Sequence, residues 1–215
     1  VEKNKTEFSF KKFEIINISL LAKITMVFSI IAVFITVGFK LDIFFSGLFY
    51  YGNNQFLLQS HYLFSIFFRK ILIAFILLYI FALPVLSNYI PIKKLFFGYK
   101  FSSKEIVFIF VSSLTTLIVI VNILLKDFWG RTRPNEILEF GGGDVFAPWF
   151  RFGESCESNC SFVSGDASVG FLLVIFYFIT KNNIYCYLAI FFGSLFGLVR
   201  VAAGGHFFSD IIFSQ

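Results

Sequence analysis

Charged residues are scarce in this chain. Only 14% of its 215 residues are Asp, Glu, Lys or Arg, whereas soluble domains contain roughly 25%. Hydrophobic residues make up 58% of the chain, and 21% of all residues are aromatic. A soluble core of this size could not enclose so much apolar surface. The composition therefore excludes an ordinary soluble domain and indicates a protein that lies in lipid.

Other organising features are also missing. No internal repeat, low-complexity tract or linker divides the chain, so we expect a single domain over residues 1–215. No cluster of Cys, His and Asp has the spacing of metal ligands, so we predict no metal and no cofactor. The net charge of +5 is better explained by membrane topology than by binding to nucleic acid.

Long apolar runs are what the chain has in abundance. The nine residues after His206 read as the start of a helix that the chain does not complete. Five earlier runs come close to the ~20 residues that a helix needs to cross a bilayer. We therefore predict an all-α, polytopic membrane protein, a six-transmembrane-helix bundle whose sixth helix is truncated in this chain. The five runs are Ile18–Phe39, Phe67–Tyr89, Ile106–Leu125, Gly165–Thr180 and Ile184–Ala203.

Lysines predict how these helices are oriented. They cluster before the first run and between the second and third, and Lys181 follows the fourth. By the positive-inside rule these segments lie in the cytoplasm. Residues 1–17 are then a cytoplasmic or interfacial segment, and residues 126–163 form a loop on the opposite side. The clustered lysines are Lys3, Lys5, Lys11, Lys12, Lys93, Lys94, Lys100 and Lys104.

Three polar clusters lie at the ends of the runs, all on the predicted outer side. Charges near a bilayer are costly, which makes such clusters candidates for function. The first holds Arg131 between two further basic residues. The clusters read "KDFWGRTRP" from Lys126, "SFVSGDAS" from Ser161 and "VRVAAGGHFFSD" from Val199.

The basic residues of these clusters suit a phosphoryl group. Lys126, Arg133 and Arg200 would converge if the helix ends pack together, and their donors match phosphate oxygens. Backbone N–H groups at Ser164–Asp166, at a helix start, would add further donors. Taken singly, Lys126 and Arg133 would more often be residues whose charged ends reach the membrane interface.

His206 and Asp210 are four residues apart, so on a helix they share a face. A carboxylate there could hold one imidazole nitrogen and leave the other nucleophilic. Taken alone, His206 would more often be an interfacial histidine, and Asp210 could cap the last helix. His61 has no partner in the sequence, and we assign it no function.

The three clusters resemble the type 2 phosphatidic acid phosphatase superfamily of integral membrane lipid phosphatases. Its signature is Lys-x6-Arg-Pro, then Pro-Ser-Gly-His, then Ser-Arg-x5-His-x3-Asp. This chain departs from it at Val163, Asp166 and Val199, where proline, histidine and serine are usual. The matching residues are Lys126, Arg133, Pro134, Ser164, Gly165, Arg200, His206 and Asp210.

The resemblance implies a mechanism. His206 would attack phosphorus and form a phosphohistidine, with Asp210 orienting its ring. Asp166 replaces the histidine that normally protonates the leaving oxygen, and a carboxylate whose pKa is raised by the bound phosphate could take that role. Asp166 could instead orient a basic residue or bind a sugar hydroxyl of the substrate. The resemblance assigns phosphate binding to Lys126, Arg133, Ser164, Gly165 and Arg200.

The stretch "CESNCSFVSGDAS" is similar to the branch that includes bacterial lipid A phosphatases. This resemblance implies a multi-pass enzyme of the bacterial inner membrane whose site faces the periplasm. Its substrate would be a phosphorylated lipid of the outer leaflet, and the 4'-phosphate of lipid A fits best. Phosphatidylglycerophosphate and undecaprenyl pyrophosphate are alternative substrates. A protein that binds or transports anionic lipids is the alternative outside enzymes.

Two cysteines, Cys156 and Cys160, lie in the predicted outer loop. In an oxidising periplasm they could form a disulfide that closes a small loop, and a close pair of free thiols is the alternative. Cys186 lies inside an apolar run, where we expect it to be a small apolar residue.

Overall fold

The structure is a computed structural model that describes residue 27 and residues 40–59, 61–89, 99–153 and 155–215. Almost all of them belong to the second of two compact units, Phe39–Gln215. The predicted first span apart from residue 27, the segment 1–17, and the lysines at positions 93 and 94 lie outside the described residues.

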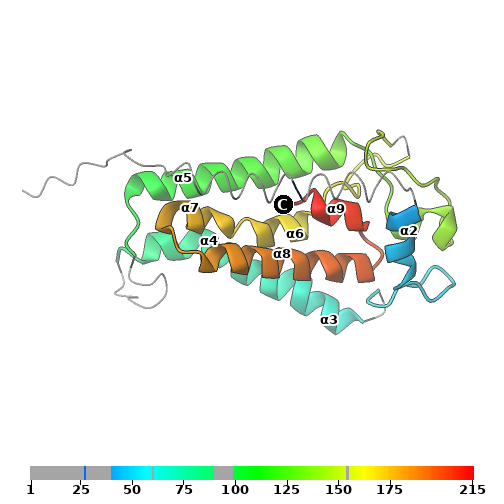
Figure 1. The fold of residues 1–215 in the computed structure, drawn as a ribbon, viewed down its shortest axis with the longest axis horizontal. Coiled ribbons are helices and arrows are strands. Elements are labelled where there is room, and N and C mark those ends of the chain that lie inside the picture. Colours follow the sequence, from blue (N-terminus) through cyan, green and yellow to red (C-terminus); the bar gives the residue numbers. More distant parts are fainter. Residues whose placement is uncertain (1–26, 28–39, 60, 90–98, 154) are drawn as a thin grey trace, which may run out of the picture. The chain divides into compact units, whose positions relative to one another are not determined.

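All regular elements of the described residues are helical, with no strand among them, and Figure 1 gives their order along the chain. The all-α prediction is therefore confirmed. The elements are α2 (Lys40–Gly47), α3 (Tyr62–Ile66), η1 (Phe67–Leu72), α4 (Ile73–Leu86), α5 (Ser103–Leu114), η2 (Thr115–Asp127), η3 (Pro134–Glu136), η4 (Leu138–Phe140), α6 (Gly165–Phe171), α7 (Val174–Thr180), α8 (Ile184–Ala202) and α9 (Phe208–Ile212).

Three described helices are long and apolar enough to cross a membrane. They contain 20, 25 and 19 residues, so at 1.5 Å per residue they reach about 30, 37 and 28 Å, close to the thickness of a bilayer's apolar core. The fourth predicted run is shorter and breaks between α6 and α7 at Leu172 and Leu173. The three long helices are Phe67–Leu86, Ser103–Asp127 and Ile184–Ala202.

The start of α5 is fixed by a reciprocal cap. The Ser102 hydroxyl accepts a hydrogen bond from the Glu105 N–H, and the Glu105 carboxylate accepts one from the Ser102 N–H at 2.7 Å. Two N–H groups that a helix start leaves without partners are thereby satisfied. The cap sets where the long α5–η2 helix begins and hence where its far end, at Lys126, comes to lie.

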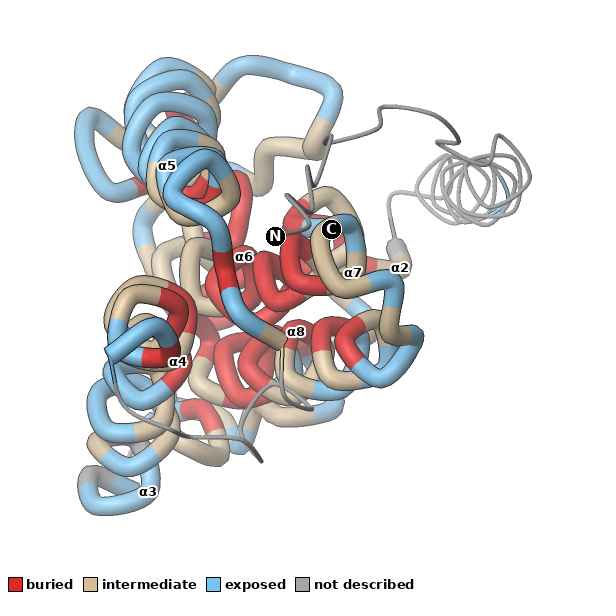
Figure 2. The backbone as a smooth tube through the Cα atoms, turned by 90° about the vertical axis from the view of Figure 1, so that its left-hand side faces the viewer, coloured by how far each residue is buried: buried red, intermediate tan, exposed pale blue. Residues whose placement is uncertain are grey.

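Helix α6 is the centre of the packing and contacts α8, α4 and η2. It approaches α8 closely because Gly170 faces Gly193: a Cβ atom on Gly170 would lie 2.4 Å from the Gly193 nitrogen. In Figure 2 the segments that face α6 are red, whereas the outer side of α5 is pale blue. The exposed residues there are mostly apolar, among them Val107, Phe108 and Val111, as expected for a surface in contact with lipid.

The end of η2, the start of α6 and the end of α8 gather at one end of the described unit (Figure 1). Helix α9 packs against both α8 and α2 at that end. The long segment between η2 and α6, residues 128–164, covers the same region. The polar residues of the three sequence clusters therefore lie at the same end of the unit, although they belong to separate elements.

Candidate active site

Residues from all three sequence clusters meet at this end of the helices. The Nζ atom of Lys126 lies against Gly165, 3.4 Å from the place that a Cβ atom would occupy there. The Asp166 carboxylate lies 3.4 Å from Nε of Arg200. His206 follows Arg200 by six residues, in the turn between α8 and α9. The convergence that the motif spacing predicts is thus present in the structure.

His206 is held through one ring nitrogen. Its Nδ1 atom lies 2.6 Å from the carbonyl oxygen of Ser161. Because a carbonyl oxygen only accepts, Nδ1 carries the proton and Nε2 keeps its lone pair. Asp210, predicted to orient the ring, has its carboxylate 3.6 Å from the same Nδ1 atom. The shorter contact is therefore to Ser161, and Asp210 acts at longer range.

The His206 side chain is almost completely buried, with 2% of its surface exposed. Burial lowers the pKa of His206 to about 4, because the imidazolium form is poorly solvated there. The Asp210 carboxylate acts against this lowering of the pKa, and the charges of Arg200 and Lys126 add to it. At neutral pH the ring is uncharged and available as a nucleophile.

Asp210 is fully buried and held by several donors. One oxygen, Oδ2, accepts from the Phe207 N–H at 2.8 Å and from the Ser161 hydroxyl. The other oxygen, Oδ1, accepts from Arg131. Ser161 therefore contacts both members of the His206–Asp210 pair, with its carbonyl on one and its hydroxyl on the other.

Arg131 is a fully buried cation whose three nitrogen atoms all donate hydrogen bonds. Its Nη2 donates to Asp42 at 2.8 Å, and Nη1 donates to Asp210 and to the Ser209 hydroxyl. Its Nε donates to the Ala147 carbonyl at 2.8 Å. Asp42, from α2, also accepts from the Ser209 N–H at 2.9 Å. These residues form a buried charge network that includes Asp210 of the His206–Asp210 pair.

Arg200 folds back over the turn that leads to His206. A Cβ atom on Gly205 would lie 2.5 Å from Nη2 of Arg200, so a larger residue there would displace the guanidinium. The Nε atom of Arg200 is buried and makes no hydrogen bond to any described residue. Asp166 is within ion-pair distance of Nε, at 3.4 Å, without the geometry of a hydrogen bond. A buried donor without an acceptor is unfavourable, so this position favours an incoming anion.

Asp166 lies between two arginines. Its Oδ2 atom is 3.4 Å from Nε of Arg200 and 3.4 Å from Nε of Arg69. Arg69 comes from η1, at the start of the second predicted run, and its side chain is partly exposed. This geometry fits the second role considered for Asp166, the orientation of a basic residue.

The short loop closed by a Cys156–Cys160 disulfide positions the other two cations. Asn159 lies within this loop, and its side-chain oxygen accepts from Lys126 at 3.3 Å. The main-chain carbonyl of Asn159 accepts from Arg133. One residue thus holds both cations of the first sequence motif.

Ser164, a predicted phosphate ligand, caps helix α6. Its hydroxyl accepts from the Ala167 N–H at 3.4 Å, and the residue is fully buried. Its carbonyl oxygen accepts from the hydroxyls of Ser168 and Ser214. In this structure the hydroxyl serves its own helix, and Gly165 presents the more accessible backbone.

Several contributors to the site were not predicted from the sequence: Asp42, Arg69, Asn159 and Ser161, together with the buried role of Arg131. The one usable signal was Asp42, a carboxylate in the otherwise apolar stretch "LDIFF". A charge surrounded by apolar residues indicates a buried partner, but nothing near it in the sequence identifies that partner.

Three other sequence expectations concern groups away from this site. His61 is exposed at the start of α3 and makes no capping hydrogen bond. Cys186 is a free thiol in α8. Within the described part of the chain, no group of three or more His, Cys, Asp and Glu residues is placed to hold a metal ion.

Comparison with known proteins agrees with the geometry of the site. The sequence model of the PAP2 superfamily matches residues 106–215, a segment that holds all three motifs. Lipid A 4'-phosphatase from Francisella tularensis subsp. novicida (strain U112) is 37% identical over 189 residues, which cover 81% of this chain and 79% of that protein. Lipid A 4'-phosphatase from Rhizobium leguminosarum is 38% identical over 98 residues, 44% of this chain and 42% of that protein.

No solved structure matches the chain. The family match extends over half of the sequence, and the Francisella relative is similar over most of it. On this evidence the chain belongs to the PAP2 superfamily.

Proposed function

We propose that the protein is a lipid phosphatase that removes the 4'-phosphate of lipid A. The observation that carries the proposal is the state of His206, which lies next to converging cations: its Nδ1 donates to the Ser161 carbonyl, and its Nε2 makes no hydrogen bond to the described residues. The names of the relatives support the choice of lipid A. Binding an anion would need the cations alone, whereas a buried neutral histidine supports a nucleophilic role.

The proposed reaction has two steps. Nε2 of His206 attacks phosphorus, the bond from phosphorus to the ester oxygen breaks, and the leaving oxygen takes up a proton. Water then attacks the phosphohistidine, which releases phosphate and restores the imidazole. Lys126, Arg133 and Arg200 stabilise the charge on the phosphoryl oxygens in both steps, which is the main task in phosphoryl transfer.

Asp166 and the substrate's phosphate compete for the same guanidinium groups in this proposal. In the unliganded protein Asp166 positions Arg200 and Arg69. When phosphate binds, these arginines turn to it and release Asp166 next to the leaving oxygen, where the freed carboxylate takes up a proton from water and then donates it to that oxygen. The Asp166→Asn variant keeps the shape and removes the charge. We expect tighter inhibition by inorganic phosphate together with a lower kcat. Near-normal kcat with an unchanged pH optimum would exclude the acid role.

The proposed location is the bacterial inner membrane, with the site facing the periplasm and acting on outer-leaflet lipid. Among the described residues, Lys100, Lys104 and Lys181 lie at the helix ends opposite the site, which favours a cytoplasmic position for those ends. A membrane-impermeant maleimide applied to spheroplasts tests this. We expect labelling of Val145→Cys in the long loop, and labelling of Asn183→Cys only after permeabilisation. The reverse pattern would contradict the orientation.

The substrate is tested by incubating the purified protein with lipid A, phosphatidylglycerophosphate and undecaprenyl pyrophosphate, followed by mass spectrometry. We expect the loss of one phosphate from lipid A, from the 4'-position, and no loss with His206→Asn. Preferential hydrolysis of another lipid would redirect the substrate assignment. Lipid binding without hydrolysis by the wild-type protein would support the anion-binding alternative instead.

A further inference from the structure

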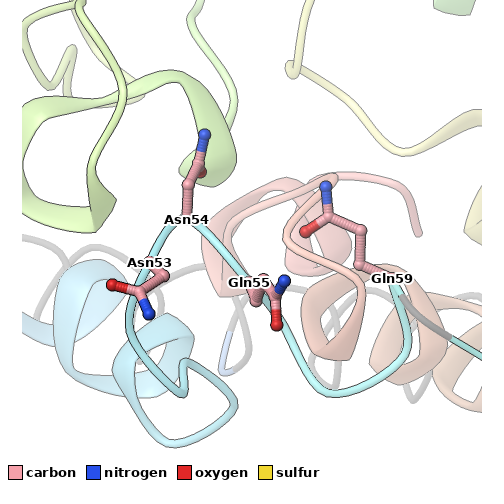
Figure 3. Close-up of a pocket in the computed structure, with 4 residues that line it drawn as sticks. All are labelled: Asn53, Asn54, Gln55 and Gln59. Carbon is pink, nitrogen blue, oxygen red and sulfur yellow. The ribbon is translucent and has the colours of Figure 1, made fainter.

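The loop between α2 and α3 carries an unusual concentration of carboxamide side chains. Four of them surround a hollow of about 440 Å³ (Figure 3). None of the lining residues is charged, in contrast to the nearby phosphate site. The lining residues are Asn53, Asn54, Gln55 and Gln59.

The backbone of this loop is tied to itself in several places. Tyr51 N–H donates to the Gln55 carbonyl and Gln55 N–H to the Gly52 carbonyl, each at 3.0 Å. Asn53 and Asn54 have φ values of 52° and 57°, a region that asparagine adopts more readily than most residues. The sequence of the loop therefore suits its conformation, which fixes where the amides lie.

The hollow is anchored to the turn that carries the nucleophile. Phe56, at the base of the loop, packs on Gly204: a Cβ atom there would lie 2.4 Å from its ring. Leu58 N–H donates to the Ala202 carbonyl at 3.0 Å. His206 follows Gly204 by two residues, so their Cα atoms are at most about 7.6 Å apart. The loop that carries the hollow is therefore packed directly against the turn that carries His206.

A second anchor links the hollow to the phosphate-binding segment. Asn135 N–H donates to the Gly204 carbonyl at 3.1 Å, and Arg133 lies two residues before Asn135. With its amide in the better-bonded orientation, Asn54 donates to the carbonyls of Asn135 and Phe140, at 3.0 and 3.2 Å. The loop that carries the hollow thus contacts segments 133–140 and 202–206, which contain Arg133 and His206.

The amides divide into two pairs by what they do. Asn54 and Gln59 hold the loop together, since Gln59 Oε1 accepts from the Phe56 N–H at 3.3 Å. The side chains of Asn53 and Gln55 are exposed and make no hydrogen bond to the part of the chain that the structure describes. They are the pair that can bind a ligand without loss of the loop's own contacts.

We infer that this hollow binds the sugar ring to which the scissile phosphate is attached, while the phosphate lies at His206; the inference rests on the proposed function. Each carboxamide both donates and accepts hydrogen bonds, which matches hydroxyl and N-acyl groups of a hexosamine. A set of neutral amides does not favour a second phosphate, for which cations would be needed. The hollow thereby selects a phosphorylated amino sugar over a glycerol phosphate.

The test compares two lipid phosphate monoesters, lipid A and the sugar-free phosphatidic acid, in the wild type and the double variant Asn53→Ala/Gln55→Ala. With two hydrogen bonds to the sugar removed, we expect the ratio of kcat/KM values, lipid A over phosphatidic acid, to fall about tenfold. The fall should come from KM, because the reacting atoms are untouched. Asn183→Ala, an exposed amide at the other end of α8, is the matched control and should leave the ratio unchanged.

Free N-acetylglucosamine gives a second readout. It should inhibit the wild type competitively, and the double variant less, with a thermal melt showing that both are folded. An unchanged ratio together with unchanged inhibition would overturn the sugar site while leaving the proposed function standing. A wild type that does not hydrolyse lipid A at all would instead overturn the proposed function.

Discussion

Two groups of charged side chains lie at the same end of the molecule and differ in how their charges are matched. In the buried group, Arg131 makes direct hydrogen bonds to Asp42 and Asp210, and all three are buried. In the phosphate-site group, Asp166 forms ion pairs with Arg69 and Arg200, each at 3.4 Å, and Asn159 accepts hydrogen bonds from Lys126 and Arg133. The four cations of this phosphate-site group are Arg69, Lys126, Arg133 and Arg200.

The difference separates structural charges from binding charges. A buried ion network is stable only when its partners satisfy one another, and the Arg131 network meets that condition. An excess of cations over carboxylates, with the buried Nε of Arg200 making no hydrogen bond to the described residues, favours a further anion. Replacing an arginine should therefore destabilise the fold in the first group and impair catalysis in the second.

Arg131→Met should have the largest effect. It leaves Asp42 and Asp210 buried without their cation, and removal of one partner of a buried pair costs about 3–5 kcal/mol of unfolding free energy. We expect a strongly lowered melting temperature in detergent and no activity. Adding Asp42→Asn should recover part of the loss, because it removes one of the orphaned charges. Strictly additive losses in this double-mutant cycle would contradict the network.

Arg200→Met is the matched change in the phosphate-site group. It removes a donor to the developing charge on phosphorus, an effect of roughly 100- to 1,000-fold on kcat. The melting temperature should stay near that of the wild type, since the buried Nε of Arg200 makes no hydrogen bond to the described residues. A large loss of stability would place Arg200 with the structural group.

The pH dependence should reflect the buried state of His206. Its pKa of about 4 means that the nucleophilic, neutral form persists as the pH falls from 7 to about 5. After correction for ionisation of the substrate's phosphate, kcat/KM of the free enzyme should fall only below about pH 5. An acid limb near the ordinary histidine pKa of 6.5 would show that the ring is not buried in the working enzyme.

The smallest effect concerns the disulfide loop that holds Asn159. Cys156→Ser opens the loop and loosens the contacts of Asn159 to Lys126 and Arg133. With both cations still present, we expect KM to rise a fewfold while kcat changes little. Cys186→Ser, which removes a thiol in α8, is the control and should behave as the wild type. Equal behaviour of the two variants would show that the loop does not position the cations.

The phosphate-site group of side chains could largely be predicted from the sequence, whereas the buried group around Arg131 could not. The spacing of Lys126, Arg133, Arg200 and His206 places each at a helix end, and long apolar helices bring such ends together. Asp42 lies 89 residues before Arg131, and no local pattern links them. Ser161 contributes its backbone carbonyl to His206, which no side-chain motif can reveal.

The central claim, that His206 is the nucleophile beside these cations, is tested most directly by peptide mass spectrometry of a rapidly quenched reaction with lipid A. The account predicts one phosphoryl group on the peptide that contains His206. It also predicts that this adduct is absent from His206→Asn, which should not turn over. Turnover by His206→Asn, or a phosphoryl group carried by another residue, would contradict it.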